Sequence, residues 1–233
     1  MAGRLSKTTI YIDGYNLYYS RLQGTAFKWL DVVAPFRDQI LAVQDPNIEV
    51  TTVKFFTAPV KANFARHGEA SEQAQEQYHR ALRAKYPGVV EIIHGFHIFQ
   101  PTSLPAHVEG QPPSKADRAR VWMIEEKLSD VNLALHVYRD AMRGVAEQLV
   151  ICSNDSDLEP ALQFVRRAAP QVKIGLVMPL REGAKGQGMI SNKRLTSQAS
   201  WVRHHIRDEE LAQSQLPANV QTKKKPASKP SHW

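Results

Sequence analysis

The sequence predicts an α/β fold, a three-layer sandwich in which helices cover both faces of a mostly parallel central sheet. Short apolar runs rich in β-branched residues alternate along the chain with longer segments of helical periodicity. Gly, Pro and Asp residues lie between these segments, as is typical of turns and helix ends. The 233 residues are 42% hydrophobic and 23% charged, as in an ordinary globular domain. Strands joined by helices pair in parallel through right-handed crossovers.

The N-terminal part of the chain predicts strands and helices in alternation. Residues 8–12 (TTIYI) read as a buried strand, and Gly14 allows a sharp turn after Asp13. Asp31 suits the N-cap of a helix, and Pro87-Gly88 ends a later one. The expected elements are helices at 16–22, 31–43 and 71–86, and strands at 50–57 and 89–99, the last bent at Gly95.

The C-terminal part continues the alternation after a proline-rich segment. Residues 100–113 contain four prolines and predict a loop. The expected elements that follow are a long helix at 121–143, a strand at 148–153, a helix at 157–169, a strand at 172–178, and short helices after Gly188 and at 208–213.

The domain organisation follows from composition. Residues 1–200 are expected to form one domain with its core at 7–180, and 201–216 a helical extension. Residues 217–233 are basic and contain prolines, which predicts a disordered tail. This tail holds four lysines, at 223–225 and 229, so the net charge of +7 leaves 7 − 4 = +3 on the body.

Several classes of protein are excluded by simple counts. The one cysteine, Cys152, lies in an apolar run and is expected to be a buried thiol. No apolar stretch is long enough to span a membrane, and the N-terminus lacks a signal-peptide pattern, so cytoplasm is the expected location. The spacings that mark zinc sites are also missing.

Carboxylates follow two of the predicted strands. Asp13 ends the first, and Asp155 and Asp157 follow the strand that ends near Ser153. Ligands of parallel α/β sheets bind at this end of the strands. Asp13 before Gly14 is also a common turn pair, and Asp155 is also a good helix N-cap, so each has a structural alternative.

A further carboxylate comes from the long helix. A helical wheel places Asp130 away from the expected solvent face of Glu125, Asn132, His136, Arg139 and Arg143. The expected core stripe is Ile124, Leu128, Val131, Leu135, Tyr138 and Met142. Asp130 then either pairs with Lys127 or joins the other carboxylates. Converging carboxylates need a cation, and oxygen ligands favour Mg²⁺ or Mn²⁺.

Three motifs of the chain resemble those of the NYN domain, a branch of the PIN-like nuclease superfamily. They are YIDGYN at 11–16, EK at 126–127 with DVNLA at 130–134, and SNDSDL at 153–158. The resemblance implies a PIN-like, Rossmann-like fold and divalent-metal ribonuclease activity. It assigns the catalytic metal site to Asp13, Asp130, Asp155 and Asp157, with Asn16 orienting a ligand or the water and Ser153 supporting the loop. His136 departs from the motif, where another aspartate is frequent.

Aromatic and basic residues supply candidate substrate contacts. Tyr15 either stacks on a base of RNA or packs against the first helix. Lys127, Lys185, Lys193 and Arg194 are the candidate cations for a phosphate backbone.

The leading hypothesis is a metal-dependent ribonuclease in which an activated water hydrolyses RNA phosphodiester bonds. A catalytically weak RNA-binding or regulatory module is the first alternative, and His136 favours it. The second alternative is a metal-dependent enzyme that acts on a small molecule. A closed, aromatic-lined pocket over Asp13 would favour that alternative, and an open basic groove would favour the ribonuclease. RNA is the expected partner, and a homodimer is an option.

Overall fold

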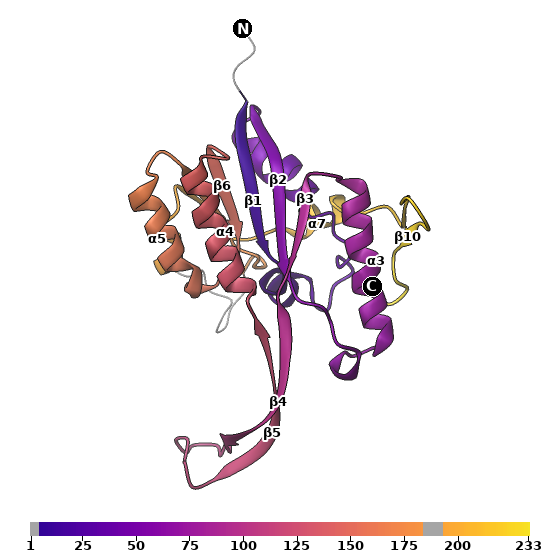
Figure 1. The fold of residues 1–233 in the computed structure, drawn as a ribbon, viewed down its shortest axis with the longest axis vertical. Helices are drawn as coiled ribbons and strands as arrows, with labels where there is room; N and C mark the ends of the chain where they lie inside the picture. Colours follow the sequence, from indigo (N-terminus) through magenta and orange to yellow (C-terminus); the bar gives the residue numbers. More distant parts are fainter. Residues whose placement is uncertain (1–4, 184–192) are drawn as a thin grey trace.

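The computed structural model describes residues 5–183 and 193–233, and it confirms the α/β fold (Figure 1). Its central sheet has six strands, all parallel, in the order β3-β2-β1-β6-β7-β8. The strands are β1 (Ser6–Asp13), β2 (Ile48–Thr57), β3 (Val90–His94), β6 (Gln148–Cys152), β7 (Lys173–Val177) and β8 (Trp201–Arg203).

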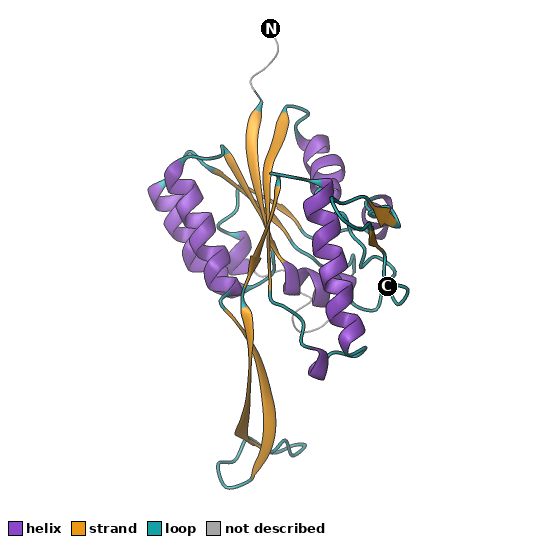
Figure 2. Ribbon diagram, turned by 45° about the vertical axis from the view of Figure 1, so that its right-hand side comes forward, coloured by secondary structure: helices purple, strands orange, loops and turns teal. Residues whose placement is uncertain are grey.

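Helices cover the sheet on both faces, as Figures 1 and 2 show. One face carries α4 (Ser129–Arg143) and α5 (Glu159–Ala168), and the other carries α3 (Glu69–Lys85) and α7 (Asp208–Gln213). The shorter helical segments are α1 (Gly14–Leu17), η1 (Tyr18–Leu22), η2 (Pro35–Leu41), α2 (Ala42–Gln44), η3 (Ala62–Phe64), η4 (Ser156–Leu158) and α6 (Lys193–Thr196). Within the described ranges, no helix is both long and apolar enough to cross a membrane.

The core lies on both sides of the sheet because alternate side chains of a strand point to opposite faces. In β1, Ile10 and Ile12 pack on the α3 side, whereas Tyr11 packs on the α4 side. The hydroxyl of Tyr11 donates a 2.8 Å hydrogen bond to Asp140, which also pairs with the buried Lys54. This polar contact anchors α4 to the sheet. Cys152 is fully buried, as expected.

A long hairpin replaces the expected loop at 100–113 and the first part of the expected helix at 121–143. Strands β4 (Phe96–Pro105) and β5 (Arg118–Lys127) pair antiparallel and project from the body (Figure 1). The prolines of β4 are compatible with this because a two-stranded ribbon has unpaired outer edges. Gly95 separates β3 from β4, as expected, since a Cβ there would lie 2.3 Å from the Lys127 carbonyl.

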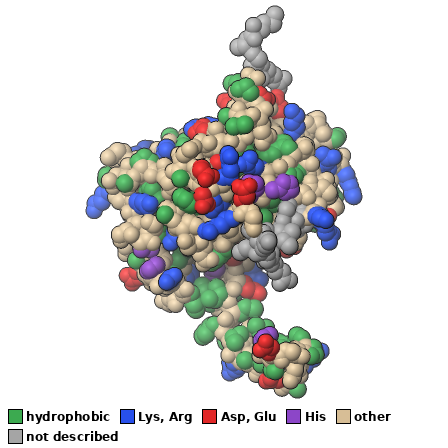
Figure 3. All heavy atoms as spheres, turned by 180° about the vertical axis from the view of Figure 1, so that it is seen from behind, with side chains coloured by type: hydrophobic (Ala, Val, Ile, Leu, Met, Phe, Trp, Pro, Cys, Tyr) green, Lys and Arg blue, Asp and Glu red, His purple; other side chains and the backbone are tan. Residues whose placement is uncertain are grey.

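The hairpin exposes apolar side chains, which Figure 3 shows in green where it leaves the body. Trp122 is 65% exposed, and Ile124 and Phe96 are each nearly half exposed. An isolated ribbon of this kind gains little stability in water by itself. The homodimer stays a prediction, which one chain does not test.

The predicted core stripe of α4 was wrong. Val131, Leu135, Tyr138 and Met142 are between 39% and 58% exposed. The buried face is instead Leu133, Val137 and Ala141, together with Asp140. Periodicity finds two apolar stripes on this helix and does not say which one faces the sheet.

The disorder predicted for residues 217–233 was also wrong. Strands β9 (Asn219–Val220) and β10 (Ala227–Ser228) pair antiparallel beside α3. Val220 and Ala227 are buried in the core, and Trp233 contacts Trp29 and Tyr78 at ring-centroid distances of 6.1 and 5.6 Å. Three apolar side chains are enough to fold a basic segment onto the body. The extension at 201–216 is not purely helical either, because β8 joins the main sheet next to β7.

Candidate active site

Asp13 lies at the carboxyl end of β1, at the centre of the sheet edge. The Asp13 carboxylate caps α1, where Oδ1 accepts a 2.9 Å hydrogen bond from the Asn16 amide. Its other oxygen accepts a 2.9 Å hydrogen bond from Ser153 Oγ. Only 6% of Asp13 is exposed, so both carboxylate oxygens have one defined position.

The loops after β1 and β6 brace each other around this carboxylate. Asn16 Oδ1 accepts a 3.0 Å hydrogen bond from the amide of Asn154. Ser153 Oγ accepts one of 3.1 Å from the amide of Asp155. Ser153 thus contacts both loops, the supporting role that the NYN resemblance implies for it, whereas the orientation of a ligand or water by Asn16 stays a prediction.

Three of the four predicted carboxylates meet. Oxygens of Asp13, Asp130 and Asp155 all lie within 4.8 Å of one another. That separation suits ligands of one cation with bonds of about 2.0–2.6 Å. Asp157 is exposed and outside this acidic triad, and its amide donates a 2.9 Å hydrogen bond to Asp155.

A strained turn brings Asp130 to the triad. Leu128 has φ 78°, a left-handed conformation that is uncommon for a side chain of this kind. The chain turns there from β5 into α4, so Asp130 falls in the first turn of the helix, beyond the end of the sheet. Asp130 lies three residues before the buried Leu133 but is itself exposed. Strain of this kind is found at functional sites.

The triad holds its negative charge at a cost. The pKa of Asp13 is raised to about 7, chiefly by burial and also by the nearby Asp130 and Asp155, against the hydrogen bonds from Asn16 and Ser153. Burial also raises the pKa of Asp130, with Asp155 and Asp157 adding to the effect. A bound cation would relieve this repulsion.

Among the described residues, the basic side chains predicted to bind substrate pair with carboxylates outside the triad or are exposed. Lys127 Nζ lies 2.6 Å from Glu125 and is not paired with Asp130. Arg194 pairs with Glu159 at 2.8 Å, and Lys193 is exposed on α6. Lys185 lies outside the described residues.

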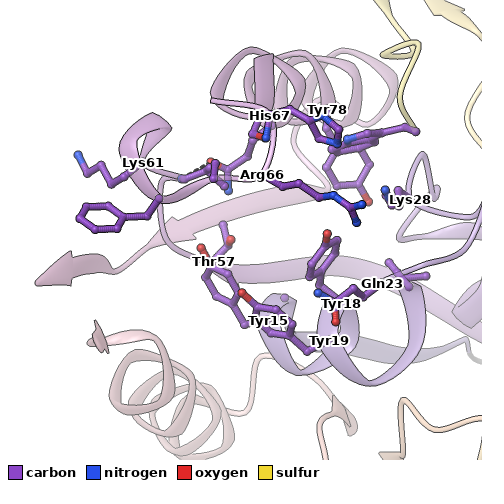
Figure 4. Close-up of a pocket in the computed structure, with 18 of the residues that line it drawn as sticks. Tyr15, Tyr18, Tyr19, Gln23, Lys28, Thr57, Lys61, Arg66, His67 and Tyr78 are labelled. Carbon is purple, nitrogen blue, oxygen red and sulfur yellow. Dashed lines mark hydrogen bonds between the residues drawn. The ribbon is translucent and has the colours of Figure 1, made fainter. Parts of the chain in front are cut away.

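A pocket of about 500 Å³ begins at Gly14 and Tyr15, directly after Asp13 (Figure 4). Eight Phe, Tyr and Trp side chains line it, and they come from distant parts of the chain. Among them are Tyr15, Tyr19, Phe64, Tyr78, Phe99 and Trp233. Sequence reasoning found only Tyr15 there, because no single segment carries the pattern.

Tyr15 is held in place within the pocket wall. Its hydroxyl donates a 3.0 Å hydrogen bond to the Ala58 carbonyl. Its ring stacks on Tyr19 with centroids 5.8 Å apart and meets His97 edge-on at 5.6 Å. Because these contacts already fix the ring of Tyr15, a ligand that stacks on it costs little side-chain entropy.

Glu126 connects the pocket with the triad. Its Oε1 atom is buried without a hydrogen-bond partner in the described part of the chain. Burial raises the pKa of Glu126, the side chain of Ser129 opposes the rise, and Asp130 adds to it. Burial raises the pKa of Tyr15, and the charge of Glu126 is the next cause. Sequence reasoning noted Glu126 only as part of a motif.

Comparisons with known proteins give one relative and one similar structure. A Pseudomonas putida S16 protein named 6-hydroxy-3-succinoylpyridine 3-monooxygenase HspA is 40% identical over 242 residues, covering 97% of this chain and 75% of the relative. A crystal structure of a protein of unknown function from Vibrio parahaemolyticus has a TM-score of 0.51 and 16% identity, and covers 90% of this chain and 98% of its own. That likeness concerns the fold alone. No protein-family model matches the chain.

The relative contradicts the predicted ribonuclease. A monooxygenase is an oxidoreductase that acts on small molecules, whereas an endoribonuclease is a hydrolase. The nuclease and RNA-binding predictions were therefore wrong, and the small-molecule alternative is better supported. The motif resemblance to NYN domains stays a prediction.

Proposed function

The chain belongs to the family of the 6-hydroxy-3-succinoylpyridine 3-monooxygenase HspA, and from this premise we propose that it is a monooxygenase that hydroxylates a small aromatic molecule. Such an enzyme places one atom of O₂ on the substrate and reduces the other to water with electrons from a donor. The protein's part in this reaction is to bind and orient the ring and to keep water away from it.

The observation that carries the proposal is the aromatic pocket next to Asp13. Its volume of about 500 Å³ lies within the usual range for small-molecule sites, roughly 300–1,000 Å³. Rings stack well on the flat walls that Tyr15 and Tyr19 provide.

The acidic triad is proposed to hold Mg²⁺ or Mn²⁺. Its donors are all carboxylate oxygens, which these cations prefer. A cation there would polarise an oxygen atom of a bound substrate. Asp13 and Asp155 fit this role because the loops after β1 and β6 fix them, while Asp130 faces solvent and leaves room for a ligand.

Glu126 is proposed to act on a proton of the substrate. A ring that carries a hydroxyl group, as 6-hydroxy-3-succinoylpyridine does, becomes richer in electrons and more reactive toward oxygen when that hydroxyl gives its proton to a base. Glu126 has a buried oxygen without a partner in the described part of the chain, and its charge acts on Tyr15 of the pocket wall, so it can accept this proton.

The test is oxygen labelling with the full chain. The purified protein, 6-hydroxy-3-succinoylpyridine, Mn²⁺ or Mg²⁺ and reduced nicotinamide dinucleotide are incubated under ¹⁸O₂, and the product is weighed by mass spectrometry. We expect ¹⁸O in the product, and less product with Glu126→Gln. A parallel incubation uses H₂¹⁸O and unlabelled O₂. Label that appears in the product only in that incubation would refute oxygenation and indicate a hydrolase. Glu125→Gln, the neighbouring carboxylate, which pairs with Lys127, is the matched control.

A further inference from the structure

The aromatic pocket carries positive charge without any negative counterpart. Lys28, Lys61 and Arg66 line it, and no Asp or Glu does so among the described residues. Asp13 of the acidic triad directly precedes Gly14 and Tyr15, which line the pocket. The cavity is therefore both aromatic and cationic.

Arg66 and Lys28 have no carboxylate partner in the described part of the chain, within the 4.0 Å of an ion pair. The buried Lys54 and the half-buried Arg203, by contrast, do pair, with Asp140 at 2.5 Å and with Glu210 at 2.6 Å. Figure 4 shows Arg66 pointing across the pocket toward Tyr18 and Lys28. Two unpaired cations on one cavity repel each other, and an anion between them removes that repulsion.

The charges act on the pocket interior. Burial and the neighbouring Tyr19 raise the pKa of Tyr18, while Arg66 opposes that rise. Burial lowers the pKa of His232, another lining residue, and Lys28 is among the further causes. Both effects place the fields of Arg66 and Lys28 inside the cavity.

We infer that the pocket binds an aromatic carboxylate, with the ring against the tyrosine wall and the carboxylate held by Arg66 and Lys28. The planar guanidinium of arginine fits a carboxylate with two parallel hydrogen bonds. This orientation also keeps the substrate's charge away from Asp13 and Asp130, which would repel it. The inference rests on the proposed function for the choice of an aromatic substrate.

A phosphate of a dinucleotide electron donor offers the same anionic chemistry. A second set of titrations therefore uses reduced nicotinamide dinucleotide in place of the aromatic acid. Because binding is measured without turnover, the result does not depend on whether oxygen is inserted.

The experiment compares two probes by calorimetry on the full chain. One is 6-hydroxy-3-succinoylpyridine, and the other is its neutral carboxamide, which keeps the ring and loses the charge. The parent is expected to bind the acid at least about tenfold more tightly, as a charge-assisted hydrogen bond provides. Arg66→Met should bring the two affinities within about threefold, and Arg66→Lys should restore part of the preference.

The control is Arg167→Met, which removes the same charge from an exposed position on α5 that does not line the pocket. It should keep the parent's preference for the acid. Arg66 is exposed and has no ion pair, so its variants should fold, and circular dichroism checks this.

Other results overturn the inference. Equal affinity of the parent for acid and amide, or no binding of either, removes the anion site. So does an acid preference that survives in Arg66→Met. A loss of dinucleotide affinity in Arg66→Met, with acid affinity unchanged, assigns the cations to the donor instead. If acid selectivity depends on Arg66 but no ¹⁸O enters the product, the binding site stands and the proposed oxygenation fails.

Discussion

Ser153 Oγ donates a 2.9 Å hydrogen bond to Asp13 Oδ2, and this contact joins the ends of two neighbouring strands at the acidic triad. Both residues are buried, so the carboxylate oxygen has no access to water as a substitute donor.

Replacing Ser153 with alanine should therefore weaken both the fold and the proposed metal site. The buried Asp13 oxygen loses its donor, which costs about 1–3 kcal/mol of unfolding free energy. Loss of a group that orients a metal ligand reduces affinity by roughly 10–100-fold. Urea titration and Mn²⁺ calorimetry measure the two effects. Ser156→Ala, an exposed serine in the same loop, should change neither, and a Ser153→Ala variant with the parent's Mn²⁺ affinity would argue against the brace.

Asp155 and Asp157 should differ sharply, although only one residue separates them. Asp155→Asn removes a member of the triad and should lower Mn²⁺ affinity by at least about tenfold. Asp157→Asn should change it much less, because that side chain is exposed and outside the triad. Calorimetry on both variants decides the point. Equal losses would mean that Asp157 also binds the cation.

His79 should make stability depend on pH. Burial lowers the pKa of His79 to about 3, with His94 and Arg83 as further causes, from 6.5 in an unfolded chain. Between pH 3 and pH 6.5, His79 therefore binds a proton in the unfolded state but not in the folded state. The contribution of His79 to stability is thus complete above pH 6.5 and is lost as the pH falls toward 3.

The measurement is the free energy of unfolding in urea at several pH values. His79→Gln should flatten the fall between pH 6.5 and the acid limit of the folded state. His107→Gln, at an exposed position in the loop between β4 and β5, is the control. Parallel curves for the parent and His79→Gln would show that this histidine is protonated in the folded protein.

The C-terminal segment should stabilise the protein. Trp233→Ala removes ring contacts with Trp29 and Tyr78, and we expect a loss of about 1–3 kcal/mol and a lower melting temperature. Deleting 221–233 should cost more, because the buried Ala227 goes as well. Calorimetric melting tests both changes, with Lys224→Ala, on an exposed side chain, as the control. If the deletion left the melting temperature unchanged, the segment would instead be the disordered tail that its composition predicts.

The triad could be predicted because it depends on local rules. Asp13 and Asp155 each end a strand whose apolar pattern is plain, and parallel strands bring their carboxyl ends together. Asp130 joins the triad, one of the two outcomes expected for it, although the helix side of Leu133 and Val137 was not expected to face the sheet.

The pocket and the helix phase could not be predicted because they depend on tertiary packing. The stripe through Val131 and Leu135 is more apolar than the buried stripe, and the buried one includes Asp140, whose charge is satisfied by Lys54 from another strand. Likewise, the pocket gathers Tyr15, Arg66 and Trp233 from three distant segments. The periodicity of one segment gives no information about side chains that contact it from other segments.

The position of Trp233 also has a practical consequence for producing the protein. A purification tag fused directly after this residue starts at the wall of the aromatic pocket, where it can block the cavity or pull the indole out of it. A tag placed ahead of Ser6 is attached to the opposite end of β1 from Asp13. Preparations that carry their tag at the amino end are therefore the ones on which ligand affinities and turnover should be measured.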